Sequence, residues 1–112
     1  KSIPSVIDGH RHAQAYYGVF LKTLAAIFNH KQTDEENQRW IDLAFEIDKV
    51  VDKAVRENSL SRPDMEKAVR QQLLGLLFNV GQRVGFGIDK AQEVIEQVIQ
   101  IMRAGPADHA GR

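Results

Sequence analysis

Apolar residues recur every three or four positions along four stretches of the sequence, with polar residues between them. This spacing is that of amphipathic helices, and no stretch of useful length alternates with the period of two that a half-buried strand shows. The pattern predicts helices over residues 9–29, 34–57, 62–80 and 89–104. Four helices with short connections predict an all-α fold, either an antiparallel four-helix bundle or an orthogonal helical array.

Residues that cap helices mark the predicted helix starts. Thr33 and Glu36 have the spacing of a capping box, and Ser61 opens the third helix in the same way. Asp8 is placed to cap the first helix and Asp89 the fourth. These signals make each predicted helix a segment with its own boundaries.

The length of 112 residues favours one domain. We expect residues 9–104 to form it, after a lead-in segment at 1–8 and before a disordered tail at 105–112. The chain begins without an initiator methionine, so we also expect it to be a part of a longer protein.

Three glycines between Gly81 and Gly87 interrupt the helical pattern and predict a loop. The glycine spacing superficially resembles a phosphate-binding motif. Such motifs follow a strand and lead directly into a helix. A helix precedes this segment, so phosphate binding is disfavoured.

The composition is that of an ordinary folded domain, with 43% hydrophobic and 27% charged residues. The absence of cysteine excludes disulfides and thiolate metal sites. No apolar run approaches the roughly 20 residues that cross a bilayer. We therefore expect a cytoplasmic protein.

The formal net charge is zero, which predicts no general attraction to nucleic acid. The charge is uneven, because residues 33–58 carry eight acidic against four basic side chains. Solvated helix faces explain this, and a basic partner is the alternative. A DNA contact near Arg11, Lys22 or Lys31 is conceivable, although these residues are too dispersed to form a patch.

His10 and His12, next to Asp8, form the best candidate for metal binding or acid–base chemistry. In a helix, residues two apart point about 200° away from each other and cannot share a metal ion. Ordinary histidines at a helix start are therefore the preferred interpretation.

Asp48 and Asp52 share a helix face, the minimum for a two-metal site. No histidine is placed on a neighbouring helix to complete it. Asp52 is also spaced for an ordinary ion pair with Arg56. We therefore assign no catalytic, cofactor-binding or metal-binding residue.

Several apolar residues fall outside the main stripes of their helices. Ile41 and Phe45 lie beside Asp48 in the second helix, and Leu74 and Phe78 lie opposite the core face of the third. The second half of the third helix is therefore apolar nearly all round, as in a helix that is central in its fold or buried against a partner. These five residues are our predicted partner interface.

Four segments resemble, in order, the C-terminal helical domain of the R subunit of type I restriction–modification enzymes. They are residues 3–20 (IPSVIDGHRHAQAYYGVF), 44–51 (AFEIDKVV), 73–78 (LLGLLF) and 95–101 (IEQVIQI). The likeness extends from Ile3 to Gly105. The segment from Gly81 to Gly87 departs from it, being longer and richer in glycine than the family leads us to expect.

The resemblance implies a parent subunit with a nuclease domain and two motor domains, which use ATP and Mg²⁺ to translocate and cleave DNA. It also implies that the helical domain docks this subunit onto the modification (M) subunits. No G-x-x-x-x-G-K-[ST] motif occurs in the sequence. We therefore expect a non-catalytic assembly domain of a site-specific restriction endonuclease.

Two other functions stay open at this point. One is a free-standing helical regulatory protein or homodimer that uses the same apolar surface for itself. The other is a metal-dependent helical enzyme that uses His10, His12 and the face of Asp48 and Asp52.

Overall fold

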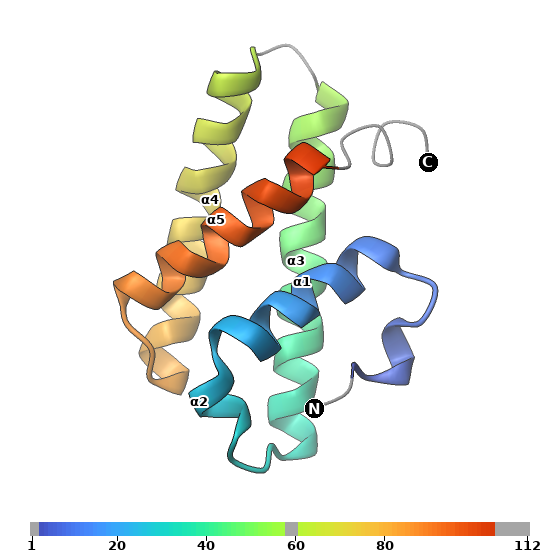
Figure 1. The fold of residues 1–112 in the computed structure, drawn as a ribbon, viewed down its shortest axis with the longest axis vertical. Coiled ribbons are helices and arrows are strands. Elements are labelled where there is room, and N and C mark those ends of the chain that lie inside the picture. Colours follow the sequence, from blue (N-terminus) through green and yellow to red (C-terminus); the bar gives the residue numbers. More distant parts are fainter. Residues whose placement is uncertain (1–2, 58–60, 105–112) are drawn as a thin grey trace. The chain divides into compact units, whose positions relative to one another are not determined.

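The chain folds into α-helices, as a computed structural model of residues 3–57 and 61–104 shows (Figure 1). The elements are η1 (Ser5–Ile7), α1 (Arg11–Thr23), α2 (Ala25–Phe28), α3 (Asp34–Glu57), α4 (Arg62–Val84) and α5 (Ile88–Ala104). No strand occurs in these two ranges, and the all-α prediction is confirmed. The predicted tail at 105–112 and the first two residues of the lead-in lie outside the described residues.

Contacts along the backbone group the chain into two compact units, residues 1–48 and 49–112. The first unit holds η1, α1, α2 and the first part of α3, and the second holds the rest of α3 with α4 and α5. No helix within the described ranges is long and apolar enough to span a membrane.

The first predicted helix, over residues 9–29, is two helices. Leu24 leaves helical geometry at φ −107° and ψ 33°, although its N–H still donates to the Phe20 carbonyl at 2.8 Å. At the other end, Gly9 adopts a left-handed φ of +86°, so the helix cannot extend back through it. Asp8 therefore ends η1, and His10 takes the cap position of α1 without a side-chain hydrogen bond.

The capping box of α3 is present as predicted. The Thr33 hydroxyl accepts from the Glu36 N–H at 3.1 Å, and the Glu36 carboxylate accepts from the Thr33 N–H at 2.8 Å. The hydrogen bond from the Thr33 backbone holds the pKa of Glu36 below its usual value. Ser61 caps α4 by accepting from the Asp64 N–H at 3.3 Å, also as predicted.

Thr33→Ala should lower the free energy of unfolding by about 1 kcal/mol, because the first turn of α3 loses its hydroxyl acceptor. Urea denaturation followed by circular dichroism measures the change. Thr33→Ser keeps the acceptor and is the matched control. Equal stability of Thr33→Ala and Thr33→Ser would contradict the capping role.

The glycine-rich segment is mostly helix, so the predicted loop is shorter than residues 81–87. Helix α4 continues through Gly81 to Val84, and Gly85 ends it at a left-handed φ of +98°. The Gly81 carbonyl accepts from the N–H groups of Gly85 and Phe86, as in a glycine-terminated helix end. Asp89 lies in the first turn of α5, which begins one residue earlier than the cap position we predicted.

Aromatic side chains form the core of the first unit. Trp40 lies 5.4 Å from Phe20 and 5.0 Å from Phe28 between ring centroids, and Tyr17 lies about 6 Å from both phenylalanines. The Trp40 indole N–H donates to the Gln32 side chain at 3.1 Å, which satisfies the one polar atom of that ring.

Aliphatic side chains form the core of the second unit. Its fully or nearly fully buried members are Val51, Val69, Leu73, Leu77, Ala91, Val94, Ile95, Val98, Ile99 and Met102. Most come from α4 and α5, so these two helices form an aliphatic hairpin.

Candidate partner interface on the α4–α5 hairpin

Two bidentate ion pairs join α4 to α5. The Arg103 guanidinium donates to both carboxylate oxygens of Glu66 at 2.9 and 2.7 Å. The Arg70 guanidinium donates to both carboxylate oxygens of Glu96 at 2.9 and 3.1 Å. Paired hydrogen bonds of this kind fix geometry as well as adding energy.

Glu66 is the buried member of this network, with only 4% of its surface exposed. The hydrogen bonds from Arg103 hold the pKa of its carboxyl below the usual value, although burial acts in the opposite direction. The Arg70 hydrogen bonds likewise lower the pKa of Glu96. All four side chains are therefore charged near neutral pH and neutralise one another.

The Arg70–Glu96 pair also fixes which residues face each other farther along the hairpin. The two helices are joined by only three residues and run antiparallel. One helical turn beyond Arg70 is Leu74, and one turn before Glu96 is Gln92. A further turn in the same directions gives Phe78 and Ile88.

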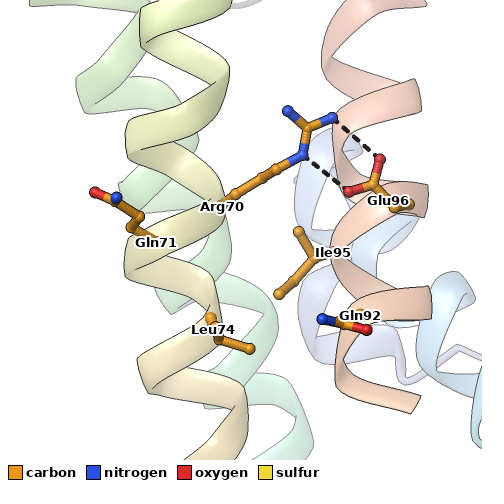
Figure 2. A pocket seen from close by; sticks show the side chains of 6 residues that line it. All are labelled: Arg70, Gln71, Leu74, Gln92, Ile95 and Glu96. Atoms are coloured by element: carbon orange, nitrogen blue, oxygen red, sulfur yellow. Dashed lines mark hydrogen bonds and ion pairs between the residues drawn. The ribbon is translucent and has the colours of Figure 1, made fainter. Parts of the chain in front are cut away.

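A groove lies between the two helices beside the ion pair. Its volume is about 370 Å³, and its lining residues are Arg70, Gln71, Leu74, Gln92, Ile95 and Glu96. Figure 2 shows Leu74 of α4 and Ile95 and Gln92 of α5 in the space between the helices, with Arg70 spanning it to reach Glu96. The side-chain amide of Gln71 points away from α5. We call this space the α4–α5 groove.

Two exposed apolar side chains lie farther toward the hairpin turn. Phe78 is 49% exposed and Ile88 is 45% exposed. Both side chains are large, and exposing their apolar surface to water is unfavourable. Burial against a partner surface would recover that free energy. They are not among the residues that line the α4–α5 groove, but helical spacing puts Phe78 one turn beyond Leu74 and Ile88 one turn before Gln92.

The neighbouring surface of α4 carries no charge. Twelve consecutive residues from Gln71 to Gln82 include no acidic or basic side chain, in a chain with 27% charged residues. The exposed members are Gln71, Gln72, Gly75, Phe78, Asn79 and Gln82. We call residues 71–82 the uncharged strip. The cores of protein interfaces are depleted in charge in the same way.

The five predicted interface residues are divided between the two units. Leu74 and Phe78 lie on the hairpin. Leu74 is half-buried and Phe78 is exposed. Ile41, Phe45 and Asp48 belong to the first unit. Ile41 is only 6% exposed, so the structure does not offer it to a partner. The buried face of α3 is broader than the stripe we assigned from sequence.

Phe45 and Asp48 are both partly buried. The Phe45 ring meets the His10 ring edge-on, with centroids 5.1 Å apart and planes at 84°. His10 therefore has an aromatic neighbour at the start of α1, and His12 lies within that helix. Across residues 3–57 and 61–104, no three His, Asp or Glu side chains are grouped closely enough to hold a metal ion.

Asp52 forms the predicted ion pair with Arg56, at 2.8 Å. The residues considered for DNA contact are all exposed. Arg11 and Lys22 lie at opposite ends of α1, about 16 Å apart along its axis. Lys31 lies in the connection between α2 and α3. The placement of these three basic residues therefore does not support a DNA site.

Sequence reasoning missed Glu66, Ile88 and the groove. One signal was available, because Glu66 lies three residues before Val69 and seven before Leu73, on the core face of its helix. A buried acid needs a partner. Arg103 could not be identified as that partner, since the pairing depends on how α5 turns back onto α4.

Comparison with known proteins adds no relative. No protein-family model matches this sequence, and no curated protein or solved structure matches it either. The function therefore has to be inferred from the residues themselves.

Proposed function

We propose that this chain is the C-terminal helical assembly domain of a type I restriction enzyme R subunit, anchoring the motor and nuclease subunit to the modification subunits. Four segments that resemble this family follow one another in the family's order, from residue 3 to residue 101. In this proposal the complex acts in the cytoplasm, restricts foreign DNA, and carries out cleavage and ATP-dependent translocation through other domains.

The observation that carries the docking role is the surface of the α4–α5 hairpin. It combines the uncharged strip, the α4–α5 groove, and the exposed side chains of Phe78 and Ile88. Contiguous exposed apolar surface beside polar residues is typical of sites that bind another protein. A role in assembly explains why such residues face outward.

ATP and Mg²⁺, which the resemblance implies for the parent subunit, do not fit the described residues of this chain. The glycines at 85 and 87 follow a helix, whereas a phosphate-binding loop follows a strand. The carboxylates of the groove region are paired with arginines. We derive no step of the reaction from this chain.

A pull-down tests the proposal directly. The 112-residue chain, immobilised through its C-terminus, should retain purified modification subunit. The same resin carrying heat-denatured chain is the control for non-specific adsorption. Failure to retain the modification subunit, when the complete R subunit binds it through another region, would exclude the docking role.

A homodimer is the second candidate, favoured by one observation. A projecting side chain, Phe78, and a groove lie on the same hairpin, so the surface can complement a copy of itself around a two-fold axis. Light scattering over a range of concentrations distinguishes the two. A mass that stays that of a monomer excludes the homodimer.

A further inference from the structure

Two buried faces of simple composition meet in the α4–α5 hairpin. The buried residues of α5 are all apolar, and those of α4 are Glu66, Val69, Leu73, Leu77 and Gly81. Contacts between aliphatic side chains have no preferred direction, because the hydrophobic effect depends on the area removed from water. The aliphatic residues therefore do not decide by themselves which turn of α5 lies opposite which turn of α4.

The connection between the two helices leaves the same choice open. Glycines occupy positions 81, 85 and 87, and the last turn of α4 runs from Gly81 to Val84. Glycine is the residue with the least restricted backbone, so this turn can unwind and lengthen the connection. Unwinding would let α5 slide along α4 by one helical turn, which is about 5.4 Å.

The two bidentate ion pairs distinguish the observed arrangement from a slide toward the connection. Arg103 faces Glu66 in the structure. Arg70 lies one turn farther along α4 and faces Glu96. Sliding α5 one turn toward the connection would place Arg103 opposite Arg70, and Glu96 opposite Leu74. Both ion pairs would be lost, and two guanidinium groups would face each other.

The burial of Glu66 disfavours a slide in the other direction. Ile99 lies one turn before Arg103 in α5, so it would replace that arginine opposite Glu66. Glu66 is only 4% exposed, and a buried carboxylate without its hydrogen-bond donors is unfavourable. Arg70 would meet the uncharged Gln92. Of the three arrangements, only the observed one pairs all four charges across the hairpin.

We propose that the buried Glu66–Arg103 pair, with the Arg70–Glu96 pair beside it, selects the register of the α4–α5 hairpin and adds little net stability. The attraction between two buried charges does little more than offset the cost of removing them from water. Removing one partner is costly, because the other charge is left unpaired. Replacing both partners by apolar side chains avoids that cost and removes the selection. This inference is independent of the proposed docking function.

The double variant Glu66→Met/Arg103→Met tests the proposal. The chain has no cysteine, so cysteines introduced at the exposed positions Lys67 and Asp89 can carry nitroxide labels on α4 and α5. The labelled double variant should melt within about 5 °C of the labelled chain without it. Pulsed electron–electron double resonance should then show two distances between the labels instead of one, differing by up to about 5 Å.

Lys53→Met/Glu57→Met is the matched control. These exposed residues form an ion pair within α3, with 4.0 Å between the charged atoms. Replacing them removes one charge of each sign from a single helix and leaves the pairs between α4 and α5 in place. The labels at positions 67 and 89 should keep a single distance.

Arg103→Glu is a second variant with an expected direction. Its carboxylate would repel Glu66 in the observed register and would attract Arg70 after a one-turn slide toward the connection. The main distance between the labels should therefore change. An unchanged single distance in either variant would overturn the inference. Loss of cooperative unfolding in the double methionine variant would also overturn it, because the pair would then be required for stability.

Discussion

Phe20→Ala is expected to lower the free energy of unfolding by about 3–5 kcal/mol, the usual cost of emptying a buried aromatic site. The Phe20 side chain is fully buried and packs between Tyr17 and Trp40. Its removal takes away the centre of the aromatic cluster and leaves a cavity that rigid rings fill poorly. Urea denaturation followed by tryptophan fluorescence measures the loss, since Trp40 reports on this cluster.

Phe78→Ala is the matched control for this prediction. It removes the same atoms from a ring that is 49% exposed, so its effect should stay within about 0.5 kcal/mol. Equal losses from the two variants would show that the aromatic cluster is not the stabilising core of the first unit.

Glu66→Gln is expected to lower the free energy of unfolding by about 1.5–3 kcal/mol, the range for hydrogen bonds to charged groups. Glutamine keeps the shape but accepts only at one oxygen, so one of the two Arg103 hydrogen bonds is lost. The charge that balances Arg103 is lost with it. Thermal or urea unfolding measures the change.

The stabilisation from Glu66 should also depend on pH in one direction. The folded pKa lies below the usual 4.5, chiefly because of the Arg103 hydrogen bonds. A lowered pKa means that the stabilisation is fully present above about pH 4.5 and is lost as the pH falls through the folded value. The difference between the unmodified chain and Glu66→Gln should therefore shrink in acid.

Glu93→Gln serves as the control for Glu66→Gln. Glu93 pairs with Lys90 at 3.3 Å on an exposed part of α5, where an ion pair contributes little. Its effect should be a few tenths of a kcal/mol at most. A pH-independent loss in Glu66→Gln would point to altered packing and against the lost charge.

Local signals in the sequence predict the helices well where capping chemistry decides the boundary. Thr33 with Glu36 places the start of α3, and Ser61 places the start of α4, because each side chain satisfies backbone N–H groups that the helix leaves open. The periodicity of apolar residues then predicts an all-α chain without reference to tertiary contacts.

The sequence does not predict two helix boundaries, because the residue types there allow more than one backbone conformation. Leu24 interrupts the first helix although leucine is a good helix former. Gly81 continues α4 although glycine favours a turn, because the left-handed residue that ends the helix is Gly85. In both cases the boundary lies where one residue leaves helical backbone geometry, Leu24 in the first helix and Gly85 after α4.

The candidate surface was predicted only in part for a similar reason. Leu74 and Phe78 stand out because they lie opposite the core face of their helix. Ile41 stood out in the same way, yet it is buried. Helical spacing gives the direction of a side chain, but it does not give the width of the helix face that neighbouring residues cover. Ile88 belongs to the candidate surface only because α5 turns back along α4.

The three-residue connection at 85–87 makes the α4–α5 hairpin sensitive to changes in length. Each residue added to a helix rotates the later part of that helix by about 100°. A single insertion at the start of α5 would turn Glu96 away from Arg70 and Ile95 away from Leu74 together. The Arg70–Glu96 ion pair and the α4–α5 groove therefore depend on the same rotation of α5 about its axis. Substitutions can alter either one alone, but insertions and deletions here remove both.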